Sequence, residues 1–309
     1  MIREEKIGFT TRWAKYSKYK MQPKGEVLYL LPDDEAELSV YDPFEYANDM
    51  LKDILTIGKE VLDDDTVKVN DLDLKYEILS KEKYYQDSVL EFVNKYGLVG
   101  NFRYLPKNYA FIDNPELELF FDYDDVVTGI DFQKRYFGFD PNADWNPENI
   151  YLSDLELKRY EIYHEQMHGD LIKDIIFSKY YAETVSEILK CAAYMYSLKN
   201  TVYTILYTDI SFEKKRLYIL DLMSCKIKKV SLGYTIRDRQ FKFEWLFNSL
   251  RAIMETILLL NETNNRTEVK LCKFCKKPFI AKNVKAEYDT PQCRNKANIY
   301  KSRNKKTNN

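Results

Sequence analysis

The chain has 309 residues, of which 45% are hydrophobic and 31% charged, so it has the composition of a globular protein with enough apolar side chains for a core. Its 9 Gly and 9 Pro exclude a collagen-like or Pro/Gly-rich disordered chain, and its 5 Cys do not form the pattern of a disulfide framework. No stretch is long and apolar enough for a transmembrane helix, and the first residues lack the apolar segment of a signal peptide. We therefore expect a cytoplasmic protein that does not contact a membrane.

Local sequence patterns predict helices connected by short strands. Capping residues, turn residues and the period of the apolar positions place these elements. In chain order they are a strand at 27–31, a helix at 43–62, a helix at 84–96 closed by Gly97, short strands at 117–121 and 126–130, two helices within 152–198 separated at Gly169-Asp170, a three-stranded antiparallel meander at 201–207, 216–222 and 226–232, and an apolar-rich helix at 241–260.

A polar linker at 261–266 separates this body from a cluster of cysteines, so we place a domain boundary near residue 265. The predicted fold class is α+β. It comprises a mainly helical body with a small antiparallel β-meander, residues 1–265, and a basic C-terminal module of the zinc-ribbon or treble-clef kind, residues 266–309.

The charge is distributed unevenly along the chain. Residues 270–309 hold 12 Lys and Arg against Glu287 and Asp289, a net charge of +10, whereas residues 1–269 hold 35 basic and 47 acidic residues, a net charge of −12. A basic tail on an acidic body is expected when the tail contacts a polyanion. We therefore expect the tail to make any nucleic-acid contact, because the body would repel phosphates. Solubility alone, or docking of the tail on the acidic body, are the alternatives.

The cysteine cluster indicates a metal site. Cys272 and Cys275 form a C-x2-C pair, the usual half-site for tetrahedral zinc, and Cys293 follows after seventeen residues. Asp289 stands where a second pair would have its first cysteine. Aspartate can bind zinc through oxygen, so we predict a Zn²⁺ site of three cysteines and one aspartate, although a carboxylate also widens the choice of metal. The alternative is a site that binds no metal, in which the three thiols are merely buried.

A basic helix is predicted directly after Asp289. Thr290 can cap this helix with Pro291 in its first position, so that Cys293 projects from the first turn. Arg294 and Asn298 lie one turn apart and could reach base edges. The residues expected to contact nucleic acid are Arg294, Lys296, Asn298, Lys301, Arg303 and Lys305.

These residues resemble a known family. The pattern Cys272-x2-Cys275, Lys277-Pro278-Phe279 and Tyr288-Asp289-x3-Cys293-Arg294-Asn295-Lys296-Ala297 resembles the C-terminal CGNR zinc finger of bacterial proteins and related treble-clef fingers. The resemblance covers residues 271–303, and it departs from the family where Asp289 replaces a cysteine and Arg294-Asn295-Lys296 replaces Gly-Asn-Arg. Proteins with this finger are mostly uncharacterised and are regarded as transcriptional regulators. The resemblance thus implies a role in transcriptional regulation. Our hypothesis for function is nucleic-acid binding through residues 270–306, to DNA rather than RNA, with the acidic body sensing an effector, forming a homodimer or holding a protein partner.

The two histidines of the chain form a second motif. His164, Glu165 and His168 make an HExxH sequence, which on a helix places both imidazoles on one side, with the glutamate as a general base for a zinc-bound water. Glu183 or Glu187 could supply the third ligand, as in zinc peptidases with a downstream glutamate, which this motif alone resembles. A zinc metallopeptidase is therefore one alternative function, and a protein-interaction module with a purely structural finger is another.

Overall fold

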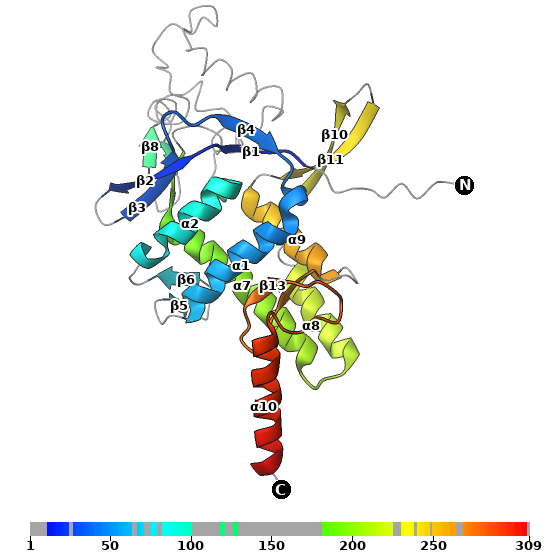
Figure 1. The fold of residues 1–309 in the computed structure, drawn as a ribbon. Coiled ribbons are helices and arrows are strands. Elements are labelled where there is room, and N and C mark those ends of the chain that lie inside the picture. The colour runs from blue at the N-terminus through cyan, green and yellow to red at the C-terminus, as the bar shows by residue number, and fades with distance from the viewer. Residues whose placement is uncertain are drawn as a thin grey trace, which may run out of the picture. The chain divides into compact units, whose positions relative to one another are not determined.

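The computed structural model describes residues 11–24, 27–63, 67–70, 75–78, 82–100, 118–120, 126–128, 181–224, 230–237, 240–247, 249–263 and 268–307. The chain divides into two compact units. Unit 1 comprises Met1–Pro43, Leu90–Glu187 and Lys229–Arg251, and unit 2 comprises Phe44–Val89, Ile188–Lys228 and Ala252–Asn309. The described residues form helices and small antiparallel sheets (Figure 1). Together with a C-terminal cluster of potential metal ligands, they confirm the predicted α+β class.

Short antiparallel sheets dominate unit 1. Its strands are β1 (Trp13–Tyr16) paired with β4 (Leu38–Tyr41), a three-stranded sheet of β2 (Tyr19–Lys24), β3 (Val27–Pro32) and β9 (Glu183–Thr184), and two hairpins, β7 (Glu118–Phe120) with β8 (Val126–Thr128) and β10 (Val230–Arg237) with β11 (Gln240–Phe247). Trp13, Leu30 and Phe247 are buried in this unit. The predicted strands at 27–31, 117–121 and 126–130 are confirmed by β3, β7 and β8.

Helices dominate unit 2, which also holds the cysteine cluster. It contains all of α1 (Ala47–Asp63), α8 (Phe212–Ser224), α10 (Pro291–Thr307), the hairpin of β5 (Val67–Asn70) and β6 (Lys75–Ile78), and the hairpin of β12 (Val269–Leu271) and β13 (Pro278–Ile280). It also contains most of η1 (Pro43–Tyr46), of α7 (Val185–Tyr207) and of α9 (Leu250–Thr263), and the first half of α2 (Glu82–Tyr96). The predicted helices at 43–62 and 84–96 are confirmed. Gly97 has the left-handed φ of 93° that closes α2 as expected.

The core of unit 2 lies between the apolar faces of α1, α7 and α9. Met50, Ile54 and Leu55 of α1 recur at helical spacing and are completely buried. Residues Ile188, Leu189, Ala192 and Met195 of α7 and Ile253, Met254 and Leu258 of α9 are buried as well. No helix within the described ranges has the length and apolar character needed to cross a membrane.

Gly58 is required where α1 crosses α7. A Cβ on Gly58 would overlap the backbone carbonyl oxygen of Ala192 and lie 2.8 Å from the Cβ of Tyr196. Both contacts are with rigid parts of the opposing helix, a backbone carbonyl group and a Cβ atom. These atoms cannot move aside as the end of a flexible side chain can. The absence of a side chain at Gly58 therefore lets the two helices approach closely, and α7 is the helix on which the cysteine module rests.

The predicted meander at 201–232 is wrong. Residues 201–207 continue α7 and residues 212–224 form α8, whereas β10 begins at Val230. The β-branched residues of this run favour strands, yet the hydroxyls of Thr201 and Thr204 donate to the carbonyl oxygens of Ser197 and Asn200, four residues earlier, at 2.8 Å. Packing of the apolar face of α7 overrides the local strand propensity.

The predicted helix at 241–260 is correct only in its second half. Residues 241–247 belong to β11, which pairs with β10 in register from Val230 opposite Phe247 to Arg237 opposite Gln240, and α9 begins at Leu250. Of the two helices expected within 152–198, the first and the break at Gly169-Asp170 lie outside the described residues. The boundary near residue 265 also lies outside them, so the separate domain at 266–309 stays a prediction.

We expect Gly58→Ala to destabilise the protein by about 1–3 kcal/mol, because the added methyl group overpacks the crossing of α1 and α7. At an exposed helical position the same change stabilises by about 0.5–1 kcal/mol, so the sign of the effect tests the crossing. Urea unfolding followed by circular dichroism measures it. Glu60→Ala, at an exposed position of the same helix, is the control and should change stability by less than about 0.5 kcal/mol.

Candidate metal centre

Residues 268–307, here called the finger, begin with a hairpin whose turn carries two of the cysteines. The turn, residues 272–277, is called the knuckle. Within it the Lys276 amide donates to the Cys272 carbonyl oxygen at 2.9 Å, and the Cys272 amide donates to the Lys277 carbonyl oxygen at 2.8 Å. Lys276 adopts a φ of 61°, a left-handed conformation that residues other than glycine seldom adopt. This tight turn places the Cys272 and Cys275 side chains on one side.

The third cysteine comes from the first turn of α10. The Thr290 hydroxyl accepts a hydrogen bond from the Cys293 amide at 3.2 Å, and Pro291 is the first residue of the helix. The cap that the sequence predicts is therefore confirmed. The partial positive charge at the first turn of a helix acts against the rise in the pKa of Cys293 that its hydrogen bond with Asp289 causes.

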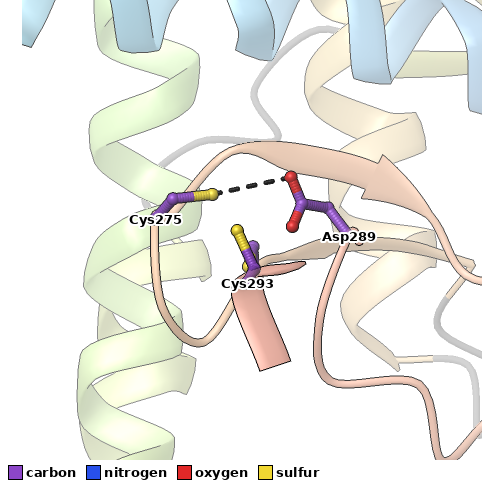
Figure 2. A group of neighbouring side chains, drawn as sticks. Cys275, Asp289 and Cys293 are labelled. Carbon is purple, nitrogen blue, oxygen red and sulfur yellow. Dashed lines mark hydrogen bonds between the residues drawn. The ribbon is translucent and has the colours of Figure 1, made fainter. Parts of the chain in front are cut away.

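The four predicted ligands converge. One ligand atom from each of Cys272, Cys275, Asp289 and Cys293 lies within 4.8 Å of the corresponding atoms of the others. Figure 2 shows the thiols of Cys275 and Cys293 and the carboxylate of Asp289 pointing toward one another. Cys272 is fully buried and the other three are half-buried, so the group lies at the edge of the packed core.

The spacing fits a tetrahedral zinc ion. Bond lengths of about 2.3 Å to sulfur and about 2.1 Å to oxygen place a sulfur and an oxygen about 3.6 Å apart around tetrahedral zinc. The Cys275 Sγ and Asp289 Oδ2 atoms lie 3.6 Å apart. These four residues would therefore hold a divalent ion, whose chemistry here would be structural, because four protein ligands complete a closed tetrahedral shell.

The acidity of the ligands reflects their crowding. Burial raises the pKa of the Cys275 thiol to about 12, against the opposing effect of a backbone hydrogen bond from Lys277. The hydrogen bond with Asp289 raises the pKa of the Cys293 thiol. Burial by itself would raise the pKa of Asp289, but hydrogen bonds from the Cys293 and Cys272 thiols hold it below its usual value. A divalent cation favours the ionised form of every ligand, so metal binding here is linked to proton release.

Two tyrosines of α7 hold the knuckle on the helices of unit 2. The Tyr196 hydroxyl donates to the Lys276 carbonyl oxygen at 3.1 Å, and the Lys276 Nζ atom lies 3.8 Å from the centre of the Tyr203 ring. Burial raises the pKa of Tyr196 to about 12, so its hydroxyl keeps its proton and remains a donor at neutral pH. Sequence reasoning missed both tyrosines. Their spacing of seven residues places them on one face of α7, but no motif connects them with the cysteines.

The hairpin of the finger is fixed by a second set of contacts in unit 2. Asn261 of α9 accepts hydrogen bonds from the Glu268 and Val269 amides at 3.1 and 3.0 Å and donates to the Val269 carbonyl oxygen at 3.0 Å. Asn48 of α1 donates to the Glu268 carboxylate. Val269 and Leu271 are buried, so the hairpin contributes to the core of the unit. The finger therefore docks through apolar contacts, hydrogen bonds and the contact of the Lys276 ammonium group with the Tyr203 ring.

Helix α10 remains exposed beyond its first turn. Among its described side chains, Cys293 and Ala297 are half-buried and all others are exposed. Arg294, Lys296, Asn298 and Arg303, four of the residues predicted to contact nucleic acid, lie among the exposed ones, while the side chains of Lys301 and Lys305 lie outside the described residues. Figure 1 shows α10 projecting away from the rest of the finger. Self-docking of the finger thus leaves this helix uncovered by the other described elements of unit 2.

The HExxH motif lies outside the described residues. The structure therefore neither joins nor separates His164, Glu165 and His168. Of the two possible third ligands, Glu183 lies in β9, where its carboxylate accepts hydrogen bonds from the amides of Val99 and Gly100 and from the Tyr181 hydroxyl. Glu187 is buried in the first turn of α7. The peptidase interpretation consequently gains no support from the geometry of the described residues.

No protein-family model, curated protein or solved structure matches the chain.

We expect purified protein to contain about one zinc per chain, measured by elemental analysis. Cys272→Ser and Cys293→Ser should abolish the bound metal, because each removes a thiolate from the shell. Asp289→Asn should weaken binding, whereas Asp289→Cys should preserve it. His164→Ala is the control and should leave the zinc content unchanged. Zinc that survives Cys272→Ser but is lost with His164→Ala would place the metal at the histidines instead.

Because the hairpin contributes buried side chains to the core of unit 2 and the knuckle docks on α7, we expect zinc to stabilise the whole unit. Free zinc at a hundred times its Kd should raise the free energy of unfolding by about 2.7 kcal/mol. Thermal unfolding with and without a chelator measures this effect. Cys272→Ser should remove the zinc dependence. An unchanged melting temperature for wild-type protein after complete removal of zinc would contradict this coupling.

Proposed function

We propose that the protein binds nucleic acid through helix α10, which the metal centre fixes at its first turn. The observation that carries this proposal is a helix with six Lys and Arg and no acidic residue, of which the described cations, Arg294, Lys296 and Arg303, are exposed. A cationic helix that is attached at one end and exposes these side chains can lie against a phosphate backbone. The residues that would make the contacts are Arg294, Lys296, Asn298, Lys301, Arg303 and Lys305.

The way the finger docks supports the proposal. The described contacts of the finger with α1, α7 and α9 are made by the knuckle and the hairpin. Lys276 packs on a tyrosine ring, and Lys273 pairs with Glu287 at 3.1 Å, so these two lysines serve the finger itself. Docking thus leaves Arg294 and Lys296 exposed for a partner.

The resemblance to CGNR and treble-clef fingers extends the proposal to transcriptional regulation in a bacterium, with DNA as the nucleic acid. The acidic body would then sense an effector, dimerise or hold a protein partner. Phosphate contacts by α10 are common to both nucleic acids, so the central proposal rests on the charge and exposure of the helix and not on the family.

A purely structural finger in a protein-interaction module is the second candidate. The observation that favours it is the docking of the knuckle on Tyr196 and Tyr203. This docking gives the metal centre a role in stability that needs no bound nucleic acid. The two candidates differ in what neutralising α10 would change. The structural role depends on the knuckle alone, whereas nucleic-acid binding depends on the exposed cations.

We expect the full-length protein to bind labelled DNA, single-stranded or duplex, with an affinity that falls steeply with salt. The double variant Arg294→Gln/Lys296→Gln should reduce the slope of log K against log salt by about 0.7–0.9 for each lost phosphate contact. Lys18→Gln removes one charge from an exposed surface pair with Asp33 and should leave the slope unchanged. Fluorescence anisotropy at several salt concentrations measures both. Absence of binding at low salt would refute the proposal and leave the interaction candidate.

A further inference from the structure

Aromatic rings gather where the finger meets α7, at the base of α10. The Tyr203 and Tyr207 ring centres lie 4.5 Å apart, and the Lys273 Nζ atom lies 5.2 Å from the centre of the Tyr207 ring. The next residue, Phe274, packs on Tyr300 of α10, with ring centres 5.8 Å apart. Tyr203, Tyr207, Phe274 and Tyr300 are here called the aromatic stripe, which comprises one ring pair on α7 and a second pair between the knuckle and α10. Lys273 connects the two pairs, because its Nζ atom lies against the Tyr207 ring and it precedes Phe274 in the chain.

One ring of each pair in the aromatic stripe is open to solvent. Tyr207 is 58% exposed and Tyr300 is 57% exposed, although both are large rings that proteins tend to cover. Their ring partners, Tyr203 and Phe274, are half-buried. The packing thus holds two largely exposed rings in place, and neither ring is needed to fill the core.

Cations flank the exposed ring on α10. Lys296 precedes Tyr300 by four residues and Arg303 follows it by three, so all three lie on one face of the helix. Both cationic side chains are exposed. The face consequently presents a cation, an aromatic ring and a second cation over about two helical turns, and Tyr207 belongs to the other ring pair of the aromatic stripe.

From this arrangement we infer that the preferred ligand is a single-stranded nucleic acid, whose bases stack on Tyr300 and Tyr207 while Lys296 and Arg303 bind the adjacent phosphates. The inference rests on the proposed function and names the form of its ligand. Bases of a single strand present open faces to aromatic side chains, and stacking tolerates any sequence because every base has such a face.

A duplex would use the same surface differently. Its bases are stacked on one another inside the helix, so exposed rings at the protein surface gain no base contact, and affinity would come from the cations alone. The exposed tyrosines therefore discriminate between the two forms. Replacing them should weaken binding of single strands and leave duplex binding unchanged.

The test measures binding of the full-length, zinc-loaded protein to labelled oligouridylate, oligothymidylate and a DNA duplex of equal length by fluorescence anisotropy. Both single strands should bind more tightly than the duplex, and the ratio between them shows whether RNA or DNA is preferred. Tyr300→Leu and Tyr207→Leu should each weaken single-strand binding about tenfold. Tyr300→Phe and Tyr207→Phe keep the ring and should bind as wild type.

Leucine keeps bulk and helix propensity, so a loss that phenylalanine restores reports the ring face and not general packing. Tyr84→Leu, at a 76% exposed position of α2, is the matched control and should have no effect. Zinc content and unfolding midpoint should be unchanged in all variants. Equal affinity for duplex and single strands, with wild-type binding by the leucine variants, would overturn this inference and leave the proposed function standing. No binding of any oligonucleotide would overturn both.

Discussion

Three thiols and one carboxylate within 4.8 Å of one another are the constraint on which the rest of the finger depends. Four groups that ionise to negative charges repel each other when they are held so close, and a divalent cation turns that repulsion into attraction. The same four residues connect the knuckle, the loop before α10 and the first turn of α10. A bound ion would therefore join three segments that contribute little apolar surface of their own.

The finger has one surface that docks on the helices of unit 2 and another that faces solvent. The side that faces α1, α7 and α9 is held by buried apolar residues, by hydrogen bonds at Asn261 and Tyr196, and by the contact of Lys276 with the Tyr203 ring. The side that faces solvent is cationic. Since the contacts that hold the finger and the charges that attract a polyanion belong to different residues, binding a ligand need not disturb the fold.

The close crossing at Gly58 connects these features with the core of unit 2. Helix α7 carries Ala192 and Tyr196 against Gly58 on one side, and the same Tyr196 donates to the knuckle. A shift of α7 relative to α1 would thus move the hydroxyl that holds Lys276. The position of α10 is consequently determined by helix packing in the core as well as by the metal ligands.

The sequence by itself determined the features that depend on neighbouring residues. The helix that begins near Pro43, the left-handed Gly97, the cap at Thr290 and the spacing of Cys272, Cys275 and Cys293 are local, because a backbone turn or a hydrogen bond to a residue a few positions away decides each of them. The alternation of Phe241, Phe243, Trp245 and Phe247 was also present in the sequence as the period of a strand, but the apolar run that follows it concealed where the helix starts.

Tertiary structure decided what distant segments do to each other. Residues 201–207 have strand propensity and are helical because the rest of α7 is packed, and the tyrosines that hold the knuckle lie as far as 80 residues from it in the chain. The same holds for Asp289. Sequence could offer it as a ligand, but its carboxylate reaches Cys275 because the loop, knuckle and helix meet in three dimensions. Contacts between residues far apart in the chain depend on the packing of every element between them, and no local pattern records that packing.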